Sequence, residues 1–201
     1  MQTYDPATAL IVVDVQNDFA DPAGSLSVAD ALAIIPRINA AIALARSTGA
    51  TVVYTQDWHP DTTPHFAKDG GIWPVHCVHD TWGAELHPAL DAPAEAPRIR
   101  KGANGEDGYS GFTMRDPQTG ETRPTELDEL LVERAIERVV VCGLATDYCV
   151  NATALDAIRL GYETYYLEDA VAAVNLEPGD GERATEAMID AGCQPWQIRA
   201  R

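Results

Sequence analysis

Three of the chain's five histidines lie within the segment from residue 57 to residue 76, together with a carboxylate. The candidate ligands are Asp57, His59, His65 and His76. Carboxylate oxygens and imidazole nitrogens bind Zn²⁺, Fe²⁺ or Mn²⁺, so the segment predicts a site for one divalent ion, with Zn²⁺ as the first choice. The alternative is a set of separate hydrogen-bonding groups. We interpret the two remaining histidines, His79 and His87, as structural or surface groups.

Cys149 is the candidate nucleophile. It follows an apolar strand pattern and a glycine-containing turn, CGLATDYC, and lies in the first turn of a predicted helix. The N–H groups and dipole of a helix start stabilise an anion, so we expect them to lower the pKa of this thiol and to bind the oxyanion of a tetrahedral intermediate. The alternative is a small buried apolar residue, the role that we assign to Cys77, Cys142 and Cys193.

Asp14 interrupts an otherwise apolar strand pattern, LIVVDVQNDF. Burying an unpaired carboxylate is costly, so such a residue needs a partner or a function. Asp14 could take the thiol proton of Cys149 and later deliver it to a leaving amine. Lys101 is a plausible charged partner that would hold Asp14 ionised and in place. The alternatives are a strand-end carboxylate bonded to backbone N–H groups for Asp14 and a surface residue for Lys101.

Strand and helix patterns alternate along the chain. Apolar runs rich in β-branched residues predict buried strands, and apolar residues at helical spacing predict amphipathic helices. The predicted strands cover residues 8–16, 50–56, 98–102, 138–143, 162–169 and 196–200. The predicted helices cover residues 35–49 with Pro36 in the first turn, 125–136 opened by Thr125 as N-cap, 147–161 ended by Gly161, and 180–192.

This alternation predicts an α/β fold with three layers, α/β/α, around a mostly parallel central sheet. We expect one domain over residues 1–201, with a metal-binding insertion at about residues 57–90. In open α/β sheets, sites form at the carboxyl ends of the strands. Asp14, Asp57 and Lys101 each end a predicted strand, and the turn before Cys149 follows another. The candidate residues are therefore expected to meet at one edge of the sheet.

Composition excludes several kinds of partner. The formal net charge is −17, from 14 basic and 31 acidic residues, which argues against nucleic acid or an anionic membrane as a partner. No apolar run approaches the roughly 20 residues of a membrane helix, and the first residues do not resemble a secretion signal. The four cysteines show no paired spacing and are expected to be reduced thiols. We expect a cytoplasmic protein that acts on a small molecule; the sequence is compatible with a homo-oligomer and does not define one.

The chain resembles the isochorismatase-like cysteine hydrolases, and within them the nicotinamidases (pyrazinamidases), over nearly its whole length. The matching segments are VVDVQNDFADPAGSL, DWHP, HFA, WPVHCV, HPAL, RKGAN, YSGF and VCGLATDYCVNATALDA. The segment GLATDYCV is similar to the nucleophile signature of the superfamily. The pattern of one aspartate and three histidines narrows the resemblance, because related amidohydrolases and isochorismatase generally lack it. The loop 102–109, GANGEDGY, varies among relatives and leaves the pocket rim undefined.

The resemblance implies a metal-dependent cysteine amidohydrolase that converts nicotinamide to nicotinate and ammonia in the salvage of NAD, and that also hydrolyses pyrazinamide. Cys149 would be the nucleophile, Asp14 the acid and base, and Lys101 its partner. The backbone N–H groups of Ala145 and Cys149 would form the oxyanion hole, beside a cis peptide at Leu144–Ala145.

The resemblance also implies how substrate binds. Asp57, His59, His65 and His76 would hold the metal, which the pyridine nitrogen coordinates. The residues lining the substrate pocket would be Phe19, Trp73, Tyr109 and Leu144. Two other interpretations stay open: an amidohydrolase of a carbamoyl or ureido substrate from the same superfamily, and a metal-binding α/β module without activity. The absence of a G-x-G-x-x-G motif after the first strand weakens a nucleotide-binding module.

Overall fold

The computed structural model describes residues 3–196, which form a six-stranded parallel sheet. The strand order is β3-β2-β1-β6-β7-β8, and every neighbouring pair is parallel. The strands are β1 (Thr8–Val13), β2 (Thr51–Asp57), β3 (Arg98–Lys101), β6 (Arg138–Leu144), β7 (Glu163–Ala172) and β8 (Gln194–Trp196). The central strands are buried almost throughout, because helices cover both faces of the sheet.

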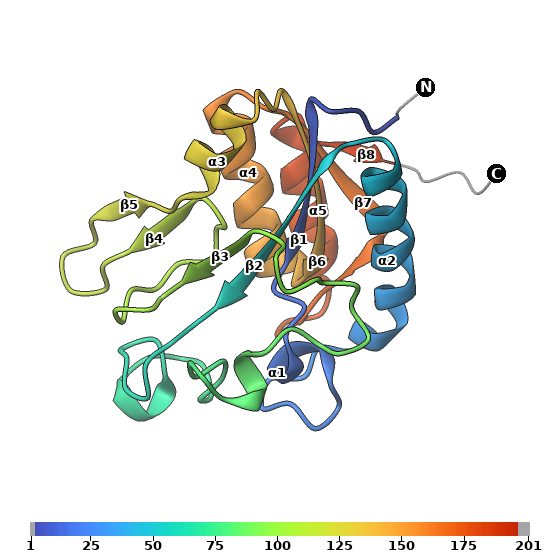
Figure 1. Cartoon of the computed structure of the whole chain (residues 1–201). Coiled ribbons are helices and arrows are strands. Elements are labelled where there is room, and N and C mark those ends of the chain that lie inside the picture. The colour runs from blue at the N-terminus through green and yellow to red at the C-terminus, as the bar shows by residue number, and fades with distance from the viewer. Residues whose placement is uncertain (1–2, 197–201) are drawn as a thin grey trace.

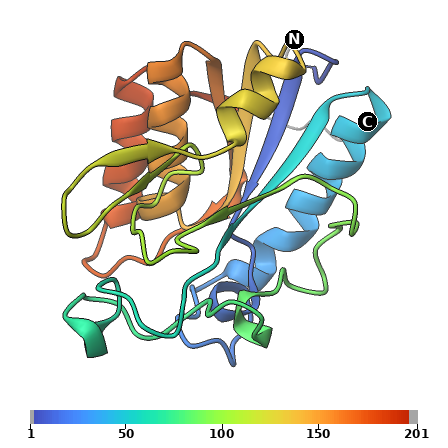
Figure 2. The same ribbon diagram turned by 60° about the vertical axis from the view of Figure 1, so that its left-hand side comes forward.

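Helices cover the two faces unequally (Figure 2). One face packs mainly against α2 (Ala31–Ser47), and the other against α3 (Leu127–Glu133), α4 (Asn151–Leu160) and α5 (Asp180–Asp190). Successive residues of β1 alternate between the two cores: Leu10 and Val12 contact the α2 side, while Ile11 and Val13 contact the other. The predicted three-layer α/β/α architecture is confirmed.

Several predicted boundaries were wrong by a few residues. Helix α2 begins at Ala31, so Pro36 lies in its second turn rather than its first and removes one helical hydrogen bond. Helix α3 is shorter than predicted, because Ala135 adopts a left-handed conformation that ends it. Thr125 is not its N-cap, although its hydroxyl oxygen accepts the N–H of Leu127 at 3.2 Å. Of the last predicted strand, 196–200, only Trp196 is described, and it belongs to β8; residues 197–200 lie outside the described residues.

Five short elements were not predicted. They are the hairpin of β4 (Thr113–Arg115) and β5 (Thr122–Pro124), the one-turn helix α1 (Asn17–Ala20), and the 3₁₀ turns η1 (Ala67–Asp69) and η2 (Trp82–Ala84). Elements of three or four residues are too short to produce a hydrophobic period. Tertiary contacts hold these turns in place.

The strand order reverses between β1 and β6, which lie side by side although far apart in sequence. Such a switch point opens a crevice at the carboxyl ends of the strands. Gly143 allows this approach: it has φ +110°, and an added Cβ would lie 2.1 Å from the carbonyl oxygen of Val13. The long segment 58–97 between β2 and β3 lies below the same ends of the strands (Figure 1).

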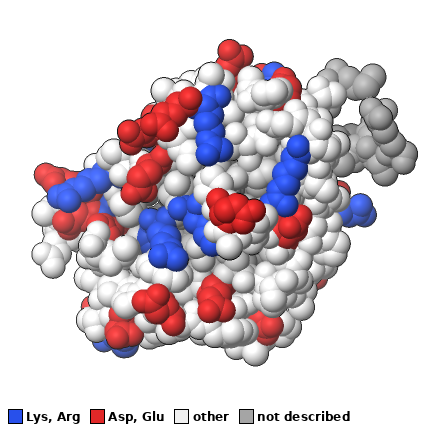
Figure 3. Space-filling view, in the orientation of Figure 1, with Lys and Arg blue, Asp and Glu red and all other residues white. Residues whose placement is uncertain are grey.

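The surface carries both signs of charge. On the face drawn in Figure 3, acidic side chains are spread widely and basic ones lie among them, with no continuous basic strip on the described part of that face. None of the helices in residues 3–196 is long and apolar enough to span a membrane.

Candidate active site

Lys101, at the end of β3, lies at the centre of a buried cluster of titratable groups. Its Nζ is 2.8 Å from Asp14 Oδ2, 2.5 Å from Asp57 Oδ1 and 3.6 Å from Cys149 Sγ. All four side chains are buried. The predicted grouping of Asp14, Lys101 and Cys149 is therefore present, and Asp57 joins it as a second carboxylate on the lysine.

Asp14 lies directly after β1 and faces the thiol. The chain turns there with φ 48°, and the Thr55 hydroxyl donates a 2.6 Å hydrogen bond to Asp14 Oδ1. One carboxylate oxygen each of Asp14 and Asp57 and the Sγ of Cys149 lie within 4.8 Å of one another. A proton on the Cys149 sulfur therefore has a carboxylate acceptor close by.

Burial and charge set the protonation states of this cluster. Burial raises the pKa of Asp14 despite the opposing charge of Lys101, which makes Asp14 a better proton acceptor than an exposed aspartate. Burial also raises the pKa of the Cys149 thiol well above its ordinary value, and the charge of Lys101 does not overcome it. The expected lowering of this pKa at a helix start was wrong, because burial and two carboxylates outweigh the lysine. Burial therefore favours the thiol over the thiolate at this position.

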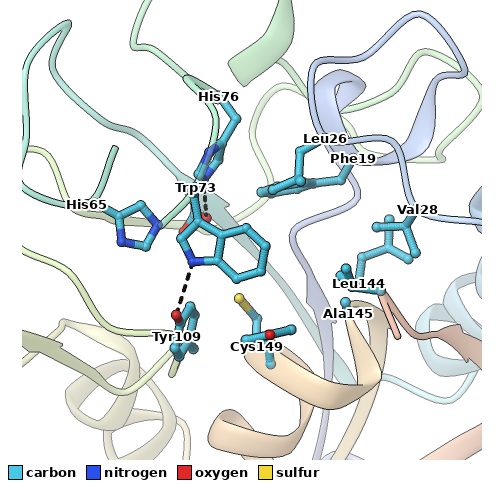
Figure 4. A pocket seen from close by; sticks show the side chains of 13 residues that line it. Phe19, Leu26, Val28, His65, Trp73, His76, Tyr109, Leu144, Ala145 and Cys149 are labelled. Carbon is cyan, nitrogen blue, oxygen red and sulfur yellow. Dashed lines mark hydrogen bonds and ion pairs between the residues drawn. The ribbon is translucent and has the colours of Figure 1, made fainter. Parts of the chain in front are cut away.

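Cys149 lies in a turn of π-helix, Thr146–Val150, that follows β6 and continues into α4. Ala145 is the N-cap of this turn, and the peptide bond Leu144–Ala145 is cis, as the resemblance implied. The Cys149 side chain points from this turn into the crevice beside β1 (Figure 4).

The three histidines of the segment 57–76 form a cluster in space. One ring nitrogen each of His59, His65 and His76 lies within 4.8 Å of the others. Both ring nitrogens of His59 are buried without a hydrogen-bond partner among the described residues. A buried polar atom without a partner is costly, so its position requires an explanation.

His76 is oriented by its second nitrogen. Its Nδ1 lies 2.8 Å from the carbonyl oxygen of Pro74 and can only donate there, which leaves Nε2 unprotonated. This Nε2 and the Nε2 of His59 each lie 3.8 Å from Asp57 Oδ2. The four predicted metal ligands therefore lie together, with Asp57 shared between the histidines and Lys101.

The surroundings favour the neutral imidazole of His65 and His76. Burial lowers the pKa of His65 to about 4 and also lowers the pKa of His76. For Asp57, burial alone would raise the pKa, but the charge of Lys101 and the nearby histidines hold it well below the usual range. The other two histidines are apart from the cluster: His79 is exposed beside Asp80, and Nδ1 of His87 accepts the N–H of Ala89.

A pocket of about 380 Å³, counted to its open mouth, joins the thiol to the histidine cluster. All four predicted substrate-pocket residues line it: Phe19, Trp73, Tyr109 and Leu144. The Trp73 indole N–H donates to the Tyr109 hydroxyl oxygen at 3.1 Å, the bond drawn in Figure 4. Cys149, His65 and His76 line the same pocket, so one small ligand could contact the thiol and the histidines together.

Sequence reasoning missed part of the pocket wall, namely Leu26, Val28, Tyr148 and Val174. Tyr148 packs edge-on against Trp73 and Tyr109, with ring centroids 4.9 and 5.1 Å away. Its position in the sequence, directly before Cys149, could have indicated that Tyr148 lines the pocket. Val174 follows the carboxyl end of β7, where the same strand-end rule applies. Leu26 and Val28 lie in an irregular loop that carries no such signal.

Comparison with known proteins supports the fold and shows the family. Residues 8–196 match the Isochorismatase domain. A nicotinamidase of Escherichia coli (strain K12) is 37% identical, covering 96% of each chain. A pyrazinamidase of Pyrococcus horikoshii, solved in complex with zinc, is 43% identical with a TM-score of 0.85, covering 96% of this chain and 100% of its own. PnC1 of L. infantum, solved in complex with nicotinate, is 37% identical with a TM-score of 0.86, covering 98% of this chain and 96% of its own. The chain therefore belongs to the isochorismatase domain family, within its nicotinamidase/pyrazinamidase group.

Proposed function

We propose that this chain hydrolyses nicotinamide to nicotinate and ammonia through a Cys149 acyl-enzyme, and that it also hydrolyses pyrazinamide. The observation that carries the proposal is one pocket lined both by Cys149 and by two members of the histidine cluster, His65 and His76. An amide carbonyl needs only the nucleophile and an oxyanion site. The histidines beside them are best explained by a substrate that has a second ligand atom, such as a ring nitrogen.

The histidine cluster fits a divalent metal ion. Its nitrogens converge, both nitrogens of His59 lack hydrogen-bond partners among the described residues, and His76 presents a free Nε2. We propose that His59, His65, His76 and Asp57 would hold Zn²⁺, with Fe²⁺ or Mn²⁺ as alternatives. The Pyrococcus horikoshii relative was solved with zinc. When bound, such an ion would supply a coordination position for the pyridine nitrogen and so orient the ring.

The acylation step would use the groups around the thiol. Cys149 gives its proton to Asp14 as the sulfur attacks the carboxamide carbon, and the carbonyl oxygen takes the negative charge. The N–H groups of Ala145 and Cys149 donate to that oxyanion. Asp14 then protonates the amide nitrogen, ammonia leaves, and a thioester on Cys149 remains. The raised pKa of Asp14 suits a group that must both accept and return a proton.

Deacylation would run through the same groups. A water molecule gives one proton to Asp14 and attacks the thioester carbon, and the oxyanion forms in the same place. When the intermediate collapses, the carbon–sulfur bond breaks and the sulfur regains its proton from Asp14. The product leaves as nicotinate after its carboxyl group loses a proton to solvent. Lys101 stays charged throughout, because Asp14 and Asp57 hold its pKa well above the ordinary value although burial opposes them.

Ammonia release from a panel of amides tests the proposal. We expect turnover of nicotinamide and pyrazinamide by the zinc-loaded protein, and very little turnover of benzamide, which matches nicotinamide in shape but lacks the ring nitrogen. Equal rates on benzamide and nicotinamide would contradict a ring-binding metal. Preferential turnover of an N-carbamoyl or ureido compound would instead assign the chain to that branch of amidohydrolases, and no release from any amide would leave a metal-binding module.

A further inference from the structure

Gln16 is a fully buried glutamine two residues beyond Asp14 that has no part in the chemistry above. Its Oε1 accepts the backbone N–H of Asp57 at 2.8 Å, and its Nε2 donates to the backbone carbonyl of Asp57 at 2.7 Å. The same Nε2 donates to the carbonyl of Ala84 at 2.9 Å. One side-chain amide therefore satisfies both backbone groups of a single residue and also contacts the turn η2.

The need for this side chain follows from how β1 ends. The chain leaves the sheet at Asp14, where φ is 48°, while β2 continues to Asp57. The last backbone bond between the two segments runs from the Asp14 N–H to the Thr55 carbonyl at 3.3 Å. The N–H and carbonyl of Asp57 would otherwise be buried without partners on this side. The Gln16 side-chain amide offers the same donor and acceptor as a peptide group. It therefore pairs with the backbone groups of Asp57 that a longer β1 would have bonded.

Asp57 is thereby held from both sides. On the other side β3 pairs with it in register, Asp57 opposite Lys101. With its backbone fixed, the carboxylate divides its two oxygens: Oδ1 contacts Lys101 Nζ at 2.5 Å, and Oδ2 faces the Nε2 atoms of His59 and His76 at 3.8 Å. A rotation of the Asp57 backbone would disturb both contacts together.

We propose that Gln16 is a positioning residue: by clamping the backbone of Asp57 it sets the zinc affinity of the histidine cluster and the placement of Lys101 against Cys149. The effect on zinc affinity follows from the contacts of Asp57 alone. The effect on kcat rests on the proposed function, because it concerns the hydrolysis of nicotinamide.

A matched pair of variants tests this role. Gln56 is also a buried glutamine, and its Nε2 donates to the same Ala84 carbonyl at 2.9 Å, but it makes no side-chain bond to Asp57 among the described residues. Gln16→Met and Gln56→Met each replace a buried amide with an apolar side chain of similar length and each remove one donor from Ala84. They differ in the two bonds to Asp57. Zinc affinity is measured by competition with a fluorescent chelator on the full-length folded protein, alongside kcat and KM for nicotinamide and thermal unfolding.

We expect Gln16→Met to lose about 10- to 100-fold in zinc affinity, the effect of removing a group that orients a metal ligand, and to lose kcat even with zinc in excess. Gln56→Met should stay within about threefold of wild type in both, since the Gln56 side chain bonds the Ala84 carbonyl but not the backbone of Asp57. Equal losses of zinc affinity in the two variants, or unchanged affinity in Gln16→Met, would overturn the proposal. If Gln16→Met does not fold, Gln16→Asn keeps the amide but shortens its reach, and the same loss is expected.

The two readouts separate this proposal from the proposed function. If wild type does not hydrolyse nicotinamide but Gln16→Met alone loses zinc affinity, the function is wrong and the role of Gln16 toward the metal stands. If wild type hydrolyses nicotinamide and Gln16→Met binds zinc as wild type does, only the role of Gln16 is contradicted.

Discussion

Lys101 connects the two halves of the site. Its ammonium group lies between the carboxylates of Asp14 and Asp57 and within 3.6 Å of the Cys149 sulfur. Buried charges need partners, and here one cation faces two anions and a neutral thiol. The cluster therefore carries one net negative charge that is available to accept a proton. Asp14, with its raised pKa, is the better placed acceptor, because the pKa of Asp57 is held low.

Asp14 and Lys101 are expected to act as one unit. Asp14→Asn removes the proton acceptor, and Lys101→Met leaves two buried carboxylates without their cation. Each change should lower kcat/KM for nicotinamide by about 10²- to 10⁴-fold, the usual size of an acid–base contribution. The kcat/KM of the double variant should lie within about tenfold of that of the less active single variant, since the effects of residues that act together are not additive. Multiplied losses in steady-state kinetics would mean that the two work separately.

The zinc affinity should fall less steeply with decreasing pH than it would if all three histidines had ordinary pKa values. A histidine pKa that is lowered in the folded protein means that the neutral form persists to lower pH, so protons compete with zinc only below that point. Imidazoles with pKa values of about 6.5 would be roughly nine-tenths protonated at pH 5.5. The pKa of His65 is about 4, and that of His76 is lowered as well.

At pH 5.5 zinc should therefore displace fewer than two protons from the cluster, measured by titration calorimetry in buffers of different ionisation enthalpy. Three unperturbed histidines would release close to three protons. A release near three would show that the histidines are solvated in the metal-free protein, and that the buried arrangement described above is wrong.

Most of the long helices and strands could be predicted from the sequence, and most of the short ones could not. Residues 9–13 and 139–142 are continuous apolar runs, and α5 carries apolar residues at helical spacing, so burial alone predicts these elements. The hairpin of β4 and β5 has three residues in each strand and is exposed or half-buried, and no periodic pattern marks it. The start of α2 four residues before the predicted one reflects Ala31, whose small side chain is a weak signal although it is buried.

The site, too, could be predicted only in part. The strand-end rule brought Asp14, Asp57 and Lys101 together correctly, because it depends only on parallel strands. The direction of the Cys149 pKa could not be predicted, because it depends on complete burial beside two carboxylates, which spacing does not reveal. The clamp by Gln16 depends on β1 ending before β2, and only the structure shows that difference.

Gly102, directly after β3, makes room for His59. An added Cβ would lie 2.6 Å from His59 Nδ1, so Gly102→Ala must displace that ring. Gly105 is the matched control: it also has positive φ, but nothing lies within 4 Å of its added Cβ. Both substitutions carry a similar backbone cost of about 1 kcal/mol. We expect Gly102→Ala alone to lose about tenfold or more in zinc affinity by chelator competition. Equal affinities in the two variants would show that His59 does not bind the metal where it lies.

For the whole molecule, the metal should act as a stabilising ligand. The histidine cluster lies in the long segment 58–97, whose regular structure is limited to two 3₁₀ turns, and it connects this segment to β2 through Asp57. Zinc at 100 times its Kd would add about 2.7 kcal/mol of stability. In a protein of this size that corresponds to a rise in Tm of about 5–10 °C, measured by calorimetry. His59→Ala should abolish the shift. An equal shift in that variant would place the stabilising zinc elsewhere.

Amide hydrolysis by Cys149 can be measured as ammonia release from nicotinamide. The measurement compares wild type with Cys149→Ala and with Cys142→Ala, which removes another buried thiol from within β6. Wild type and Cys142→Ala should release one ammonia for each nicotinate formed, while Cys149→Ala, folded and zinc-loaded, should be slower by about 10³-fold or more. A Cys149→Ala protein that keeps a tenth of wild-type activity would contradict the cysteine mechanism.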